Sequence, residues 1–167
     1  MMISNQLKLF RPLLLIALML GSTVPALAHR QPEVVATLEH AFEDGLPVSK
    51  VTWRLHAHDA LAALELIPEA GRPDFDREET LIELAAYVAS WVEYSGGEVT
   101  TLGAEVDGNF AYVYQLVSGH VKVEHAAALS DLGKNWSNLI NLETVDGQRL
   151  STTFTADYPG GTTAATR

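Results

Sequence analysis

The sequence predicts an α+β protein, with an antiparallel β-sheet or sandwich of about seven strands and with one short and one long helix inserted after the first hairpin. Three observations support this fold class. Two segments of alternating apolar and polar residues come first, two segments with helical periodicity follow, and five more alternating segments complete the pattern. Helices grouped between runs of strands, rather than alternating with them, favour an antiparallel sheet.

The first two strands, residues 34–42 and 48–58, are predicted to form a hairpin. The turn-like sequence Glu-Asp-Gly-Leu-Pro at 43–47 separates them. Alternation along the second strand divides its side chains between an apolar and a polar face of the sheet. The apolar face would carry Val51, Trp53, Leu55 and Ala57, and the polar face would carry Lys50, Thr52, Arg54, His56 and His58.

Each predicted helix begins at an aspartate. Asp59 precedes residues 60–64, and its carboxylate would cap the free amide groups of a short helix. Asp76 and Glu79 have the spacing of a capping box, and apolar residues recur at helical spacing after them. The long helix is therefore predicted to run from Asp76 to about Tyr94.

Five further strands are predicted in the second half of the chain, separated by turns that contain glycine or asparagine. They cover residues 98–106, 109–117, 120–127, 138–145 and 149–156. The tail 159–167 consists largely of small residues and is predicted to be disordered. Residues 29–158 would then form a single globular domain.

The first 28 residues have the order of a cleavable signal peptide. Lys8 and Arg11 precede an apolar run over 13–20, and the small-residue pattern Ala-Leu-Ala ends at Ala28. The apolar run is about half as long as the roughly 20 residues that a membrane-spanning helix needs. We therefore expect cleavage after Ala28, a mature chain that starts at His29 without a membrane span, and a periplasmic or secreted location in a bacterium.

The composition excludes several classes of function. The chain carries a formal charge of −10, and loss of the two basic residues of the signal would take it to −12. Such a surface repels phosphate backbones, so we expect no nucleic-acid binding. The chain has no cysteine, which excludes disulfides, thiolate catalysis and cysteine-ligated zinc.

No complete catalytic signature is present in the sequence. It contains neither the Gly-x-Ser-x-Gly pattern of a nucleophile elbow nor the His-Glu-x-x-His pattern of a helical zinc protease. We therefore expect no catalytic residues. The favoured interpretation is a non-catalytic binding or interaction protein, whose partner is an unknown periplasmic protein or a small ligand.

Three short motifs carry a resemblance to a known family. They are His-Arg-Gln-Pro at 29–32, Arg-Leu-His-Ala-His-Asp at 54–59, and Asn-Leu-Ile-Asn at 138–141. The chain resembles a family of bacterial exported proteins of unknown function, whose members start with a His-x-Pro-like element, carry an Arg-(Leu or Ile)-x-x-x-Asp strand end and finish with an asparagine-rich strand pair. The resemblance implies the architecture and the export, and it implies no reaction.

A histidine-based metal site is the alternative function. On a strand, His56 and His58 would leave the same face with attachment points roughly 7 Å apart. The α-amine and imidazole of a processed His29 could complete a nitrogen-rich site for copper or zinc. The neighbouring Asp59 is either a helix cap or a further ligand. The opposing interpretation is that the two strand histidines are solvated and bind no metal.

Other aromatic residues have two interpretations each. Phe110, Tyr112 and Tyr114 share one face of their strand, either as a core stripe facing the long helix or as a partly exposed platform for a sugar, a peptide or a partner's edge strand. Trp136 is either an exposed contact or a side chain tucked against the core. By contrast, both His40 and His125 fall on the apolar side of a strand. Each is therefore interpreted as a histidine at the edge of the core with a backbone hydrogen-bond partner.

Overall fold

The computed structural model describes residues 31–68 and 71–166. The predicted signal peptide, residues 1–28, lies outside the described residues, as does His29. The described elements, in chain order, are β1 (Glu33–Glu43), β2 (Leu46–His56), α2 (Ala57–Leu64), α3 (Glu78–Ser90), β3 (Val92–Tyr94), β4 (Val99–Asp107), β5 (Phe110–Ser118), β6 (Val123–Ala126), the 3₁₀ helix η1 (Ser130–Leu132), β7 (Ser137–Glu143), β8 (Arg149–Thr155) and β9 (Thr162–Thr166).

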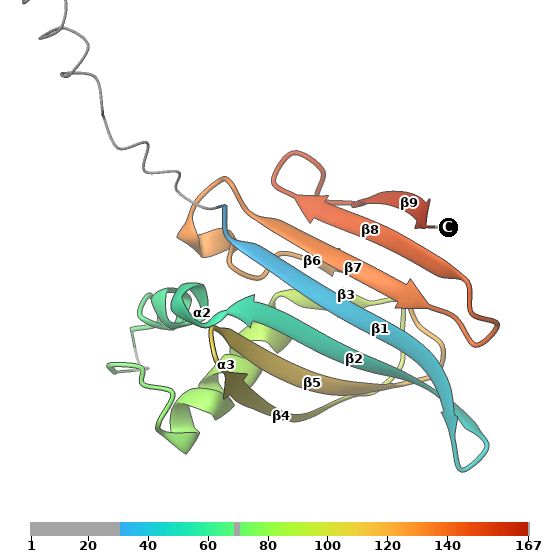
Figure 1. The fold of residues 1–167 in the computed structure, drawn as a ribbon, viewed down its shortest axis with the longest axis horizontal. Coiled ribbons are helices and arrows are strands. Elements are labelled where there is room, and N and C mark those ends of the chain that lie inside the picture. Colours follow the sequence, from blue (N-terminus) through green and yellow to red (C-terminus); the bar gives the residue numbers. More distant parts are fainter. Residues whose placement is uncertain (1–30, 69–70, 167) are drawn as a thin grey trace, which may run out of the picture. The chain divides into compact units, whose positions relative to one another are not determined.

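Seven of these strands form one sheet, in the order β4-β5-β2-β1-β7-β8-β9 (Figure 1). Strands β3 and β6 form a separate two-stranded sheet. The α+β class is therefore confirmed, with a sheet that is mostly antiparallel. No helix within 31–68 or 71–166 is long and apolar enough to cross a membrane.

One strand pair departs from the antiparallel expectation. β1 and β7 run parallel, with Val35 opposite Leu139 and Thr37 opposite Asn141. Tight turns fix the relative direction only of strands that follow each other, and almost a hundred residues separate these two. The expectation of a wholly antiparallel sheet was wrong at this pair because no local signal encodes it.

The first hairpin has the turn that its sequence predicts. Asp44 and Gly45 connect β1 to β2, and both adopt positive φ, 51° and 80°. Two central residues with positive φ give the turn the twist that antiparallel strands need, which explains the Asp-Gly sequence. The hairpin places β1 and β2 in the middle of the sheet.

The short helix begins earlier than the sequence predicts. β2 ends at His56, which is also the N-cap of α2, and no side chain caps the helix. Asp59 consequently lies inside the first turn, so its predicted capping role was wrong. An acidic side chain in the first turn still interacts favourably with the helix dipole.

The long helix is shorter at both ends than predicted. α3 begins at Glu78 with Arg77 as its N-cap, and Asp76 instead donates its backbone N–H to the Asp74 carboxylate at 3.0 Å. Its end at Ser90, rather than near Tyr94, follows from strand pairing, because Val92–Tyr94 form β3 against β6. Cross-strand hydrogen bonds here override the helical periodicity.

The C-terminal segment also differs from its prediction. Thr162–Thr166 form β9, which pairs antiparallel with β8, whereas 159–167 was predicted to be disordered. Two features support this pairing: the hydroxyls of Thr152 and Thr163 lie 2.9 Å apart, and Gly161 adopts a φ of +72°. A composition of small residues therefore does not prevent pairing where an existing strand offers an open edge.

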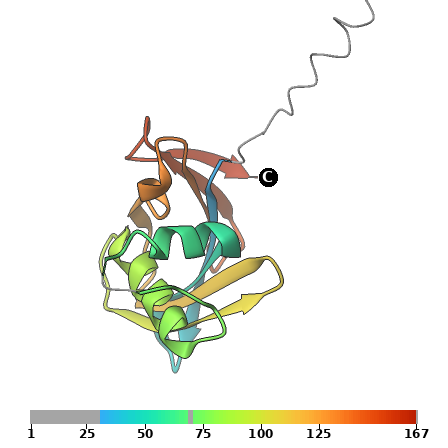
Figure 2. The same ribbon diagram turned by 90° about the vertical axis from the view of Figure 1, so that its left-hand side faces the viewer.

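The core lies on one face of the seven-stranded sheet, called here the inner face. Both helices pack beside this face (Figure 2). Alternate residues of β1, β2, β5, β7 and β8 are buried there. They include Val34, Ala36, Leu38, Val51, Trp53, Leu55, Ala111, Val113, Val117, Ile140 and Phe154. The opposite face is called the outer face, and Figure 1 looks onto it.

Candidate functional site

The aromatic side chains of β5 lie on the outer face. Ala111, Val113 and Val117 are buried on the inner face, while the alternating Phe110, Tyr112 and Tyr114 are only half-buried. The interpretation of these rings as a core stripe facing the long helix was wrong. Their position is that of the alternative, a partly exposed platform on the sheet.

Strand register aligns a row of neutral polar side chains that starts at one of these rings and crosses the sheet. Tyr114 faces Thr52, which faces Thr37, which faces Asn141, which faces Ser151, across five adjacent strands from β5 to β8. The Ser151 hydroxyl donates a 2.8 Å hydrogen bond to the Asn141 side-chain oxygen. We call these five residues the hydroxyl row.

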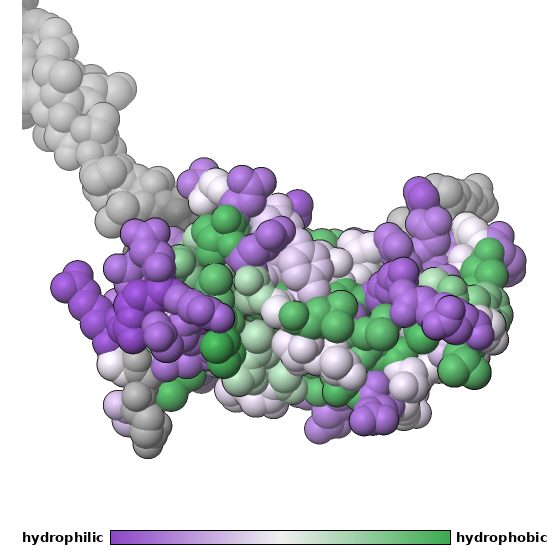
Figure 3. Space-filling model, turned by 90° about the horizontal axis from the view of Figure 1, so that it is seen from below, coloured by the Kyte–Doolittle hydropathy of each residue, from purple (hydrophilic) through white to green (hydrophobic). Residues whose placement is uncertain are grey.

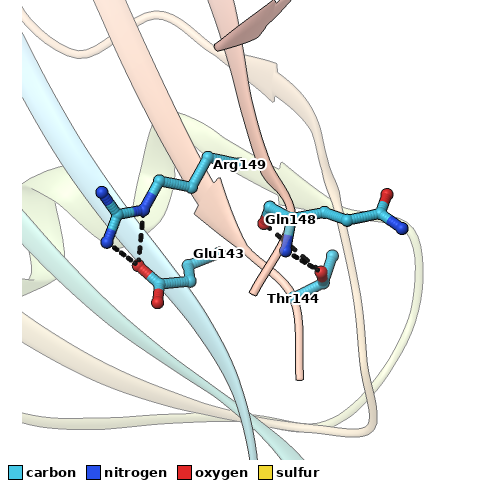
Figure 4. Close-up of polar contacts among 4 residues, drawn as sticks. All are labelled: Glu143, Thr144, Gln148 and Arg149. Atoms are coloured by element: carbon cyan, nitrogen blue, oxygen red, sulfur yellow. Dashed lines mark hydrogen bonds and ion pairs between the residues drawn. The ribbon is translucent and has the colours of Figure 1, made fainter. Parts of the chain in front are cut away.

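Charged side chains form the next row of the outer face, where Lys50 faces Glu39, which faces Glu143, which faces Arg149. The Lys50 ammonium lies 2.9 Å from the Glu43 carboxylate, and this contact raises the pKa of Lys50. Arg149 contacts Glu143 through two nitrogens, each 3.1 Å from the same carboxylate oxygen (Figure 4). Such exposed pairs add little stability, but they neutralise local charge.

On the other side of the hydroxyl row the surface is more apolar. The Arg54 guanidinium lies 5.0 Å from the centroid of the Phe110 ring, a cation–π contact, and the His56 ring lies 4.5 Å from it. Tyr112, Arg54, Val35 and Leu139 then align across four strands. The hydroxyl row is therefore flanked by a charged row and by an aromatic and apolar row.

Two hollows lie on the outer face and meet at Thr37. The first, of about 590 Å³, includes Leu102, Tyr114 and Leu116 on one side and Glu39 and Lys50 on the other. The second, of about 370 Å³, lies over β7 and β8, where its lining includes Asn141, Glu143, Arg149 and Ser151. Because Thr37 lines both, the two hollows lie next to each other near the middle of the sheet.

A β-bulge brings Leu102 to the first hollow. Thr101 is opposite Gln115 and Gly103 is opposite Tyr114, so Leu102 is an extra residue of β4 without a partner on β5. Bulges of this kind redirect a side chain and twist an edge strand away from regular pairing. Leu102 is 63% exposed, and apolar surface is visible along the β4 side of the molecule in Figure 3.

The Tyr114 hydroxyl is held by a carboxylate. It donates a 2.7 Å hydrogen bond to Glu105 on β4, and this bond raises the pKa of Tyr114 to about 12. Because the folded value exceeds the ordinary value of about 10, the bond stabilises the fold fully below pH 10, and this contribution is lost as the pH rises through 12.

We expect Glu105→Gln to return the pKa of Tyr114 toward its ordinary value, because ionised Tyr114 would no longer face a carboxylate. The measurement is a tyrosinate absorbance titration, with the Tyr114→Phe variant subtracted to isolate this transition. An unchanged Tyr114 transition in Glu105→Gln would contradict the contact.

The structure separates the predicted metal-ligating residues that it describes. His56 ends β2 and packs against Phe110, whereas His58 lies on α2 and is exposed. The prediction that both leave one face of a strand was therefore wrong, because the strand ends at His56. Within residues 31–68 and 71–166, no three His, Asp or Glu side chains, Asp59 included, lie close enough to hold a metal ion. A site that includes His29 stays a prediction, since His29 is not among the described residues.

The structure also tests the predictions made for His40, His125 and Trp136. A ring nitrogen of His40 lies 2.8 Å from the Val121 carbonyl oxygen, and a ring nitrogen of His125 lies 3.2 Å from that of Pro159, so both have the predicted backbone partner. Trp136 is 7% exposed and is tucked against the core. It is therefore not the exposed contact that one interpretation proposed.

No protein-family model matches this chain, and a search of the curated proteins found no match. The function proposed below is therefore inferred from the geometry of the outer face.

Proposed function

We propose that this chain is an exported, non-catalytic binding domain whose ligand lies on the outer face of the seven-stranded sheet. The observation that carries the proposal is the half-buried row of Phe110, Tyr112 and Tyr114 on the face that the core does not use. Large rings left partly in water are typical of contact surfaces. The predicted signal peptide and the family resemblance support the export.

The polar groups of this face favour binding over reaction. Lys50 pairs with Glu43, Arg149 with Glu143, and Ser151 with Asn141. Groups that hold one another in place form a preorganised surface, which lowers the entropic cost of binding. The two hollows at Thr37 add the concave shape that small ligands prefer.

Two hollows elsewhere are the competing locations. One, of about 540 Å³, lies beside α3 and is lined in part by Tyr87, Trp91 and Asp131. The other, of about 400 Å³, lies on the inner face between β6 and β8. Neither is lined by Phe110, Tyr112 or Tyr114, whereas Tyr114 lines the first hollow of the outer face. Mapping of bound molecules therefore distinguishes the outer face from these two locations.

The test is NMR mapping of a library of small organic fragments on protein purified after expression of the full-length chain. We expect backbone amide shifts to cluster around Thr37, Thr52, Tyr114 and Asn141. Replacing Tyr114 with alanine should abolish most of them, because the ring forms one side of the first hollow. The control is Ile82→Ala on α3, since Ile82 is 62% exposed and outside the described hollows. Shifts clustered beside α3, or between β6 and β8, would refute the proposal.

A further inference from the structure

We infer that the ligand of the outer face is a neutral carbohydrate chain that lies across the strands along the hydroxyl row, an inference that rests on the proposed function. Three properties of the row and its two neighbours support this class of ligand: charge balance, the chemistry and length of the row, and an apolar wall beside it.

Charge balance favours a ligand without charge. The cations of the charged row already have anionic partners, since Glu43 and Glu143 lie within 3.1 Å of Lys50 and Arg149, and the Arg54 guanidinium on the other side of the hydroxyl row lies over the Phe110 ring. An anionic ligand would have to displace these carboxylates. A cationic ligand would have to displace the ammonium or guanidinium group, except at Glu39, which lines the first hollow and has no ion-pair partner among the described residues. A neutral ligand needs neither exchange, so it avoids the cost of separating and desolvating charges.

The hydroxyl row offers the groups that recognise sugar hydroxyls. Thr37, Thr52 and Ser151 carry hydroxyls that both donate and accept hydrogen bonds, and the Asn141 amide adds donors on its nitrogen. The Asn141 oxygen already accepts from Ser151, which leaves the amide nitrogen directed elsewhere. Five strands at the usual spacing of about 4.8 Å extend over roughly 19 Å, which suits a chain of several sugar rings rather than one.

An apolar wall lies beside the start of the row. Leu102, Tyr114 and Leu116 form one side of the first hollow, opposite Glu39 and Lys50. A pyranose ring has C–H groups on its faces and hydroxyls around its edge. A sugar can therefore stack on the Tyr114 ring while the hydroxyls at its edge reach Thr37 and Thr52. The same sugar then contacts both the apolar and the polar side of the hollow.

A peptide strand fits this face less well. Peptides that extend a sheet bind its edge through free backbone groups. The hydroxyl row instead crosses strands β5, β2, β1 and β7, whose backbones already pair on both sides. At the β4 edge, the Leu102 bulge interrupts the regular pattern that an added strand would need.

The test is calorimetry with neutral tetrasaccharides on protein purified after expression of the full-length chain. The probes are cellotetraose, chitotetraose, xylotetraose, mannotetraose and maltotetraose, with tetragalacturonate as an anionic comparison. We expect at least one neutral probe to bind in a one-to-one complex and tetragalacturonate to bind more weakly than it. Tyr114→Ala should weaken binding about tenfold, because the stacking ring is lost. Tyr114→Phe should retain most of the affinity, because the ring remains.

Two further variants distinguish a loss of binding caused by changing the first hollow from a loss caused by any change on β4. Leu102→Ser should weaken binding, because it removes part of the apolar wall. Val99→Ser is the matched control, since Val99 is also an exposed apolar residue of β4 and does not line the described hollows. Near-ultraviolet circular dichroism of every variant shows whether the fold is intact.

The outcomes distinguish this inference from the proposed function. Fragments that map to the outer face together with no binding of any tetrasaccharide would overturn the carbohydrate class and leave the binding face in place. Tighter binding of tetragalacturonate, or tetrasaccharide binding that Tyr114→Ala leaves unchanged, would also overturn it. Fragments that map elsewhere would overturn the proposed function itself.

Discussion

Replacing Trp53 with alanine is expected to lower the free energy of unfolding by about 3–5 kcal/mol. Trp53 is the largest of the fully buried side chains, with no exposed surface, at the centre of the inner face. Its removal leaves a cavity between β2 and the elements packed over it, and a close-packed interior relaxes only in part. Denaturant unfolding of Trp53→Ala beside Ile82→Ala, an exposed substitution, measures the difference.

The hydrogen bonds of Trp53 add to this effect. Its indole nitrogen donates to the Gln115 side-chain oxygen at 2.9 Å, and the Tyr94 hydroxyl donates to the same oxygen at 2.6 Å. Gln115 is 2% exposed, and its amide nitrogen has no partner among the described residues. Burial also raises the pKa of Tyr94, so its hydroxyl keeps the proton that it donates.

A double-mutant cycle separates packing from hydrogen bonding at this site. Gln115→Leu removes the acceptor shared by the Trp53 indole and the Tyr94 hydroxyl, and the indole then keeps only its longer 3.3 Å hydrogen bond to the Tyr94 oxygen. Loss of a partner by a donor away from water costs about 1–3 kcal/mol. Trp53→Phe removes one of these donors and keeps much of the apolar volume. The loss in the double variant should therefore be smaller than the sum of the two single losses. Additive losses would show that the two side chains are not coupled through this bond.

Most strands were predictable because their turns are local. Asp44-Gly45 with two positive φ values, and Gly108 at the first central position between β4 and β5, are residues that tight hairpins require. The partner of β1 on its other side was not predictable. β7 reaches it after several intervening elements, and nothing in either strand's pattern indicates a parallel direction.

The inner and outer faces of β5 could not be distinguished from alternation alone. Both faces of this strand are largely apolar, so the two assignments fit the pattern equally well. The structure buries the smaller Ala111, Val113 and Val117 beside α3 and leaves the larger rings outside. The space between β5 and α3 determines which side chains are buried there. That space exists only once the sheet and the helix have packed together, so the strand's own sequence does not reveal it.

The hydroxyl row was missed for a related reason. Thr37, Thr52, Asn141 and Ser151 come from four different strands, and each alone is an ordinary surface residue. Only the register of those strands brings them into line with Tyr114. The aromatic spacing on β5 and the polar alternation on β2 were the signals in the sequence that pointed to this face.

Replacing Phe154 with alanine is expected to lower the free energy of unfolding by about 3–5 kcal/mol and to expose the amides of β9 to hydrogen exchange. Phe154 is 1% exposed on β8, opposite Asn138 of β7, and its ring and the His125 ring lie edge to face with their centroids 6.4 Å apart. A side-chain carbon added to Gly161 would lie only 2.9 Å from the Phe154 ring. One side chain therefore joins β8 to β6 and to the start of β9.

The matched control is Tyr158→Ala, in the loop between β8 and β9. Tyr158 is 64% exposed, and the bonds that this residue makes to Thr155 use only its backbone atoms. We expect a change within about 0.5 kcal/mol for this variant. If Phe154→Ala destabilised the protein no more than Tyr158→Ala and left β9 protected, the last two strands would be held by backbone pairing alone. A large loss of unfolding free energy with an unchanged m-value, the slope of that free energy against denaturant concentration, would instead show that β8 and β9 unfold together with the core. The m-value reports the surface that is exposed in one cooperative step.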